Sequence, residues 1–282
     1  MVCNVHNLDM RSLVGLAAAD AYTKILLSHG SVQLVSVYNY SSPPPLQQRI
    51  TITPNEQSLI DQALVLRKDT KLPFWNALFA ACLQSQTHSP ELIEAAFFHN
   101  GPGEPVAYDR VAIETGVLDA LMQSGQRNLG LSSLVNDDHD RIWHLPLLDF
   151  HCDISPRNED LAALICSHLM PGGYVLIDSG DSYHACGVTL LSPDERIQML
   201  GRALLAAPIV DGHYIAHQLQ QKASSIRISK GGKASHVPVV VRAWEPVADN
   251  HILRGKGVRD NFPDTELPLS LTPAFEAEGN VH

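Results

Sequence analysis

The sequence predicts an α+β protein, in which a β-α-β-β-α-β core with extra strands follows a mostly helical N-terminal region. Three observations lead to this fold class. Apolar residues recur at helical spacing through most of residues 11–123. From residue 144 onward, short apolar runs typical of strands alternate with segments of helical spacing. Turns rich in proline, glycine and aspartate separate these segments.

Helices dominate the first 142 residues. Consecutive prolines at 43–45 break the chain, because proline enforces an extended backbone. Thr53, followed by Pro54 and Glu56, forms the pattern of a capping box and predicts that a helix begins there. Residues 124–142 are polar, and residues 136–140 within them are expected to form a loop and a domain boundary. The other elements expected in this region are a helix at 12–27, a strand at 32–38, and helices at 74–83, 90–98 and 111–123.

The second half of the chain predicts the ferredoxin-like core. Ser155 and Ser192 each precede a proline and an apolar stripe at helical spacing, so each is expected to cap a helix. Strands are expected on both sides of these helices, which produces the split β-α-β arrangement. The expected strands are 144–152, 174–177, 183–191 and 208–211, extended by a helix at 214–221 and by strands at 225–229 and 237–243.

The pattern therefore divides the chain into three parts. Residues 1–142 form the helical region and residues 143–245 form the α+β core. Residues 246–282 are acidic and rich in proline with little periodicity, so they are expected to be loosely ordered.

Composition and charge exclude several classes of protein. The chain has 282 residues, of which 45% are hydrophobic, so it can bury a core and is not disordered by composition. Its net charge of −10 argues against a protein that coats nucleic acid indiscriminately. The five cysteines show no CxxC spacing, which excludes a zinc ribbon and argues against a disulfide framework. No apolar stretch is long enough to span a membrane and no secretory signal is visible, so a cytoplasmic location is expected.

Charge is unevenly distributed along the core. Residues 144–211 contain three basic and nine acidic side chains, whereas residues 212–244 contain five basic and no acidic ones. An acidic segment followed by a basic one suits a site that binds a metal ion and a polyanion side by side, although short windows also fluctuate by chance.

Two polar sets are expected to meet on the core sheet. The first and third strands of a split β-α-β sheet are neighbours, and residues two apart share a face. If both strands turn these sets toward solvent, carboxylate and imidazole groups converge, and Asp211 can add a third ligand. Oxygen ligands with few imidazoles favour Mg²⁺ or Mn²⁺ over Zn²⁺. The first set is Asp149, His151 and Asp153, and the second is Ser182, His184 and Cys186.

Basic residues that follow this cluster suit phosphate binding. Arg227, between two isoleucines on an expected strand, can donate two hydrogen bonds to one phosphate. Lys222, Lys230 and Lys233 can follow a nucleic-acid backbone. Asp178 and Asp181 are interpreted as turn residues.

Three short motifs carry a resemblance to a known family. Leu147-Leu148-Asp149-Phe150-His151 resembles the first motif of the archaeo-eukaryotic primase superfamily, a hydrophobic strand that ends in acid-x-acid. Ser182-Tyr183-His184 resembles the second motif, and Pro208-Ile209-Val210-Asp211 the third. The stretch from Asp149 to Ser229 resembles the divergent bacterial branch called primase 1D-like.

The resemblance implies a nucleotidyltransferase that uses Mg²⁺ or Mn²⁺ to prime or extend nucleic acid. It implies that Asp149, His151 and Asp211 act in catalysis and hold metal, and that the nucleotide is bound by Ser179, Ser182, His184 and Arg227. The implied partners are nucleoside triphosphates, a single-stranded template and a protein such as a helicase or another component of the same system.

One position departs from the family pattern. The second ligand of the first motif is acidic in the family, whereas this chain has His151. The site then prefers Mn²⁺, or Asp153 substitutes, or catalysis has been lost. Two other functions therefore stay open beside the primase-polymerase: a catalytically degenerate nucleic-acid-binding protein of a bacterial defence or mobile-element system, and a metal-dependent hydrolase.

Overall fold

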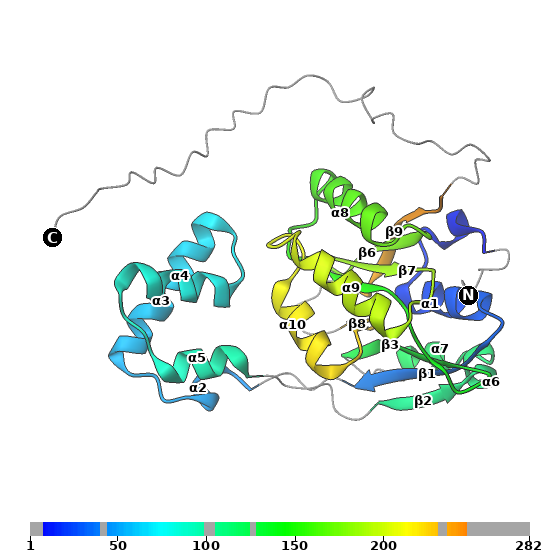
Figure 1. The fold of residues 1–282 in the computed structure, drawn as a ribbon, viewed down its shortest axis with the longest axis horizontal. Coiled ribbons are helices and arrows are strands. Elements are labelled where there is room, and N and C mark those ends of the chain that lie inside the picture. The colour runs from blue at the N-terminus through cyan, green and yellow to red at the C-terminus, as the bar shows by residue number, and fades with distance from the viewer. Residues whose placement is uncertain (1–7, 40–43, 99–104, 125–127, 231–235, 247–282) are drawn as a thin grey trace, which may run out of the picture. The chain divides into compact units, whose positions relative to one another are not determined.

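The structure is a computed structural model that describes residues 8–39, 44–98, 105–124, 128–230 and 236–246. Residues 8–246 belong to one compact unit of the chain that includes two antiparallel sheets. The predicted α+β class is confirmed (Figure 1). The predicted tail, from residue 247 on, and Lys233 lie outside the described residues. No helix in the described ranges is long and apolar enough to cross a membrane.

The first sheet is assembled from the N-terminal region together with one distant strand. Its order is β2-β1-β3-β4, and β8 pairs with the first half of β3 on the same side as β4. Helices α1, α6 and α7 accompany this sheet (Figure 1). The bounds are β1 Val32–Asn39, β2 Val106–Asp109, β3 Leu129–Asp137, β4 Ile142–His144, β8 Ser225–Arg227, α1 Ala18–Ser28, α6 Arg110–Glu114 and α7 Val117–Gln123, with a 3₁₀ turn at Met10–Leu13.

The second sheet is the predicted ferredoxin-like core. Its order is β5-β7-β6-β9, so the first and third strands of the β-α-β-β unit are neighbours, as predicted. A bridge between Phe150 and Val210 continues the sheet beyond β5. The bounds are β5 Leu147–Asp149, α8 Pro156–Leu169, β6 Tyr174–Asp178, β7 Tyr183–Gly187, α9 Pro193–Leu204, α10 Gly212–Gln221 and β9 Val239–Trp244.

Both faces of the second sheet are covered. Alternate residues such as Leu148 and Ala185 pack against α8, α9 and α10 in one core. The residues between them, such as Leu147 and Cys186, pack against α1 and the first sheet in another core. The two sheets therefore enclose a shared interior, and the edge of that interior is where the site described below lies.

Four helices form an insertion between two paired strands. Strands β1 and β2 are directly hydrogen-bonded, with Val37 opposite Val106, although more than 60 residues separate them in sequence. The intervening helices have a hydrophobic core of their own. Thr53 and Glu56 form the predicted capping box at the start of the longest helix. The bounds are α2 Leu46–Arg49, α3 Pro54–Thr70, α4 Phe74–Ser85 and α5 Pro90–Phe97.

Several predicted elements differ from the structure. Residues 129–137, which lie in the polar stretch where no strand was expected, form the central strand β3, in which Ser132 and Ser133 are fully buried. Their hydroxyl groups hydrogen bond to backbone or to His144, which allows polar residues inside a sheet. The predicted helix at 12–27 begins only at Ala18, after Gly15 adopts a positive φ.

The last predicted strands also pair differently. Residues 225–227 do not extend the core sheet but join the first sheet, because β8 pairs with β3. The strands predicted over 144–152 and 183–191 are shorter, and the helix predicted at 111–123 is divided near Gly116. The two sheets thus join residues on both sides of position 142, and the three-part division of the chain stays a prediction.

Candidate functional site

Asp149 and His184 are opposite each other on neighbouring strands. Residue 149 ends β5, and its register partner on β7 is residue 184. The distance between Asp149 Oδ1 and His184 Nε2 is 3.5 Å. The predicted convergence of an aspartate and an imidazole on one face of the sheet is therefore present.

The face that carries this pair is not the solvent face that was predicted. Leu147 and Cys186, one pleat further along the same face, are completely buried against the first sheet and α1. His184 is 7% exposed, and Asp149 is partly exposed. The pair consequently lies at the edge of the interior between the two sheets, where water has limited access.

Asp211 approaches the pair through the backbone. Its N–H donates to the carbonyl oxygen of Asp149 at 3.0 Å. Its side chain caps α10, accepting from the N–H groups of His213 and Tyr214. The carboxylate raises the pKa of Asp149 further, which shows that the two negative charges interact. Asp149 and Asp211 are thus held together by strand pairing and a helix cap.

Arg227 enters the same site from the other sheet. Its guanidinium donates to the carbonyl oxygens of Ser179 at 2.6 Å and Ser229 at 2.7 Å, which fixes its orientation. Burial lowers the pKa of Arg227, while the nearby charges of Asp181 and Asp149 raise it. Asp181, which the sequence indicated only as a turn residue, is therefore electrostatically part of this site.

The hairpin between β6 and β7 supplies the serines. Ser179 is buried, and its hydroxyl donates to the carbonyl oxygen of Ser182 at 2.9 Å. The Ser182 side chain is partly exposed and lines a neighbouring cavity. Ser179 thus supports Arg227 through its carbonyl group, and Ser182 presents its hydroxyl to the cavity.

Burial leaves polar atoms at the centre of the site without partners. Burial raises the pKa of Asp149 well above its ordinary value, and Asp211 adds to this rise while Arg227 opposes it. Burial, reinforced by Arg227, lowers the pKa of His184 to about 3, so its imidazole is neutral at pH 7. Among the described residues, Asp149 Oδ1 and His184 Nδ1 are buried atoms that lack a hydrogen-bond partner.

These unpartnered atoms fit a bound cation and its anionic ligand. A buried carboxylate oxygen without a partner is costly, and a divalent cation would offset the repulsion between Asp149 and Asp211. Two carboxylates are oxygen donors that suit Mg²⁺ or Mn²⁺. The residues present therefore fit such an ion.

His151 lies differently from the two aspartates. It lines a cavity of about 690 Å³ together with Asp153, Asn158, Asp181 and Ser182, whereas Asp149, Asp211 and Arg227 do not line it. In the described part of the chain, His151 does not form a close three-ligand group with the two aspartates. Its assignment as a metal ligand stays a prediction, and its position favours a role at the neighbouring cavity.

The close group that does occur is structural. Ligand atoms of Asp137, Asp138 and His139 lie within 4.8 Å of one another at the end of β3. The carboxylate of Asp137, however, already accepts hydrogen bonds from Arg141, Trp143 and two backbone N–H groups. The Asp137 carboxylate stabilises the turn between β3 and β4, and both of its oxygens already accept hydrogen bonds.

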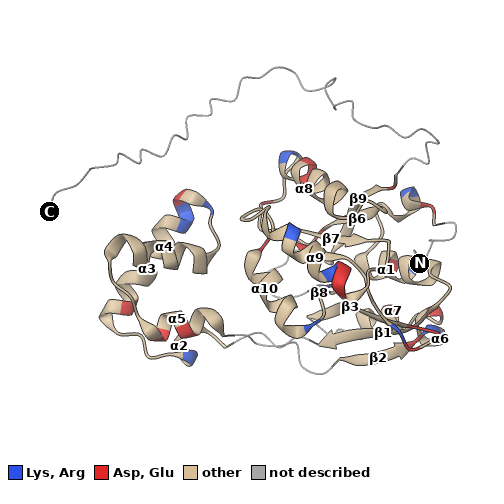
Figure 2. Cartoon of the chain, viewed as in Figure 1, with Lys and Arg blue, Asp and Glu red and all other residues tan. Residues whose placement is uncertain are grey.

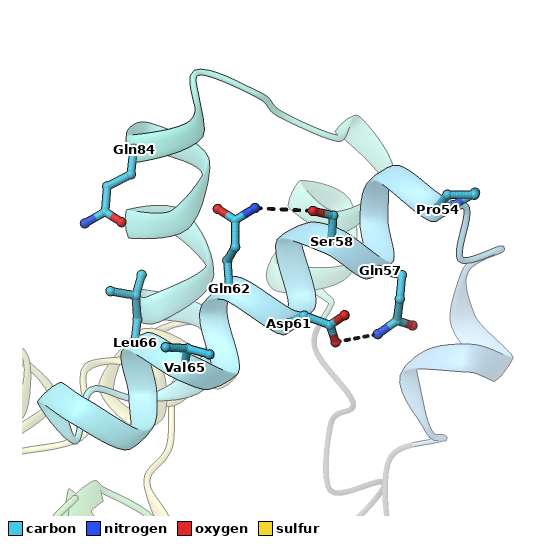
Figure 3. Close-up of a pocket in the computed structure, with 8 residues that line it drawn as sticks. All are labelled: Pro54, Gln57, Ser58, Asp61, Gln62, Val65, Leu66 and Gln84. Carbon is cyan, nitrogen blue, oxygen red and sulfur yellow. Dashed lines mark hydrogen bonds between the residues drawn. The ribbon is translucent and has the colours of Figure 1, made fainter.

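A hollow on the helical insertion is likewise satisfied internally. Figure 3 shows this surface between α3 and α4, where Gln57 donates to Asp61 and Gln62 donates to Ser58. Because these polar groups bond to each other along one helix, the hollow presents no convergent set of donors or acceptors. We therefore do not place the functional site there.

The predicted lysines lie near the strand that carries Arg227. Lys222 is exposed and ends α10 with a left-handed backbone, and Lys230 is exposed three residues after Arg227. The contacts among the described residues do not test whether either lysine binds a ligand. Their role in nucleic-acid binding stays a prediction.

The comparison with protein families concerns the segment that carries this site. Residues 114–239 match the family model of archaeo-eukaryotic primase 1D-like proteins. This segment belongs to the archaeo-eukaryotic primase superfamily. The primase-like segment includes β3, the whole β-α-β-β-α unit, and Asp149, His184, Asp211 and Arg227. No curated protein and no solved structure matches the chain significantly.

Proposed function

We propose that this protein is a divalent-metal-dependent nucleotidyltransferase of the primase-polymerase type, which adds nucleotides to nucleic acid on a single-stranded template. The observation that carries this proposal is the convergence of Asp149, His184 and Arg227 from two sheets within the primase-like segment. Sheet pairing and backbone hydrogen bonds hold all three in place, so the site is preorganised, as electrostatic catalysis requires.

The proposed reaction joins a primer to a nucleoside triphosphate. The primer's 3′ hydroxyl oxygen forms a bond to the α-phosphorus, the hydroxyl proton is lost to water, and pyrophosphate leaves. Asp149 and Asp211 would hold Mg²⁺ or Mn²⁺, which supplies neutralisation of charge on the triphosphate. The two aspartates would bind the metal ion and orient it. Strand β5 sets the position of Asp149, and the cap of α10 sets that of Asp211.

Neutral His184 and charged Arg227 suit different atoms of the triphosphate. An imidazole that is neutral at pH 7 can donate one N–H to a phosphate oxygen without adding charge beside Arg227. Arg227 uses two of its donors on backbone carbonyls and can direct others at phosphate. Ser182, at the adjoining cavity, can donate its hydroxyl to the same ligand.

The remaining parts of the proposal concern partners and location. Lys222, Lys230 and Lys233 would contact the nucleic-acid backbone, and a helicase or another component of the same system would be the protein partner. The four cysteines in the described residues are free thiols, which suits the reducing cytoplasm where we place this activity.

The experiment supplies the purified chain with labelled nucleotides and a primed single-stranded template, with and without Mg²⁺ or Mn²⁺. We expect metal-dependent extension that disappears in Asp149→Asn and persists in Asp61→Asn, an exposed aspartate on α3. Absence of extension by the native chain with every metal and both sugar types would refute the proposal.

A catalytically degenerate nucleic-acid-binding protein is the second candidate. Two observations favour it: a histidine stands where the family has an acid, and His151 does not join the two aspartates in a close ligand group within the described residues. It predicts oligonucleotide binding that Asp149→Asn leaves unchanged and Arg227→Ala weakens. Release of phosphate or ester product with Zn²⁺, without polymer, would instead indicate a hydrolase.

A further inference from the structure

The helical insertion, α2 to α5, carries a basic turn formed by Arg67, Lys68 and Lys71 at the end of α3. The chain leaves the first sheet at the end of β1, forms α2 to α5, and returns at β2 directly beside its point of departure. Because this insertion has its own hydrophobic core, the first sheet does not need it for packing. A compact insertion at one edge of a sheet is a common way to add a binding surface to a conserved fold.

Cations gather where α3 ends. Arg67, Lys68 and Lys71 lie within five residues, all exposed, in the last turn and C-cap of the helix (Figure 2). Lys71 has a φ of 61° and closes the helix by donating its N–H to the carbonyl oxygen of Arg67. Asp69 is the acidic residue of this stretch, and it does not line the cavity described next.

All three cations line the 690 Å³ cavity that adjoins the proposed site. Leu64 and Thr70 of α3 also line it, and the other side comes from the primase-like segment and includes His151, Asn158 and Ser182. Asp153 and Asp181 also belong to that side. One part of the lining is therefore basic and the other contains carboxylates together with neutral donors.

This division of charge selects the ligand. A phosphate group is attracted by Arg67 and Lys68 and repelled by Asp153 and Asp181, so the charged backbone of a ligand belongs on the α3 side. Neutral groups such as Asn158 and Ser182 can hydrogen bond to sugars or bases on the other side. Exposed, flexible lysine and arginine side chains contact phosphates without reading sequence.

We propose that the basic turn of α3, formed by Arg67, Lys68 and Lys71, binds the sugar-phosphate backbone of single-stranded nucleic acid and guides it along the cavity to the proposed site. This inference rests on the proposed function. It assigns to the helical insertion the task of strand binding, while Arg227 and His184 bind the nucleotide.

The test measures binding without catalysis. A labelled single-stranded oligonucleotide is titrated with the full chain, without nucleotide or metal, across a range of salt concentrations. Arg67→Gln/Lys68→Gln removes two charges and keeps good helix formers. Since each lost phosphate contact reduces the salt slope on single strands by about 0.7, the slope should fall by about 1.4 and affinity by about 25-fold near 0.1 M salt.

The control variant is Arg11→Gln/Lys24→Gln, which also removes two exposed cations, at sites that do not line the cavity. It should bind as the native chain does. Equal losses in both variants, or an unchanged slope in the first, would overturn the inference. A raised KM for the nucleotide with unchanged oligonucleotide binding would also overturn it, because the basic turn would then serve the triphosphate. If Arg67→Gln/Lys68→Gln loses oligonucleotide binding while the native chain shows no primer extension, strand binding by the basic turn is supported. Only the proposed reaction is then refuted.

Discussion

Asp149 and His184 are register partners on adjacent antiparallel strands, and their side chains meet at 3.5 Å between Oδ1 and Nε2. His184 is buried between the two sheets, and Asp149 is partly exposed at the edge of the interior that they enclose. Burial makes the carboxylate harder to ionise and the imidazole harder to protonate, so both groups tend toward their neutral forms until a charged ligand arrives. The site is thus arranged for a ligand that brings positive charge to Asp149.

The first prediction concerns the stability cost of Asp149. Without metal, Asp149→Asn should raise the free energy of unfolding by about 1 kcal/mol, or Tm by about 2–4 °C, because it removes a charge that burial disfavours. Mn²⁺ should stabilise the native chain but not the variant, since a ligand stabilises only the state that binds it. Thermal unfolding with a chelator and with Mn²⁺ measures both effects. A lower Tm of the metal-free variant would contradict this account.

The second prediction separates the geometry of Arg227 from its charge. Arg227→Lys keeps the positive charge but cannot donate at once to Ser179, Ser229 and a phosphate. Loss of one charge-assisted hydrogen bond is worth about 1.5–3 kcal/mol, so KM for the nucleotide should rise at least about tenfold. Steady-state extension assays measure this change. Arg202→Lys, which alters an arginine bonded to the carbonyl oxygen of His168 on the surface, should leave KM unchanged.

The third prediction is a pH dependence of stability caused by His144. Burial, reinforced by Arg196, lowers the pKa of His144 from 6.5 to about 4, and Nδ1 lies 3.0 Å from Ser133 Oγ. Between these pH values His144 binds a proton in the unfolded chain but not in the folded one. Its contribution to the free energy of unfolding is therefore fully present above about pH 6.5 and is lost as pH decreases toward 4. One pKa unit corresponds to about 1.4 kcal/mol, so the loss should reach about 3 kcal/mol.

Urea unfolding at a series of pH values tests this dependence. His144→Gln should flatten the decline below pH 6.5 but not remove it, because burial also lowers the pKa of His184, to about 3, and the pKa of His29. His168→Gln, at an exposed position on α8, should decline as the native chain does. A decline in His144→Gln as steep as in the native chain would contradict the assignment.

Local signals predicted the helices and part of the site well. Thr53 with Glu56 and Ser192 with Glu195 form the capping boxes that their spacing indicates. The alternation along β5 and β7 placed Asp149 and His184 on one face, because a strand has a period of two and the β-α-β-β order makes these strands neighbours. Capping and alternation depend on residues near one another in sequence, and the neighbouring strands follow from the order of elements in the β-α-β-β unit.

Two failures came from contacts that are distant in sequence. Strand β3 contains consecutive serines and reads as polar, yet β1, β4 and β8 satisfy its backbone from both sides. Ser225–Arg227 reads as a continuation of the core sheet, yet it pairs with β3 about 95 residues earlier. No local pattern specifies such a partner.

The amino-acid sequence by itself determined the helix caps and the β-α-β-β-α order, since capping and periodicity act within a few residues. That order, together with the alternation along each strand, placed Asp149 and His184 on one face of neighbouring strands. Tertiary structure decided that this pair faces a second sheet instead of solvent, that Arg227 reaches it from that sheet, and that His151 lines a separate cavity with the basic turn of α3. The physical reason is that burial and charge at a site depend on which distant surfaces pack together, and packing is a property of the whole chain.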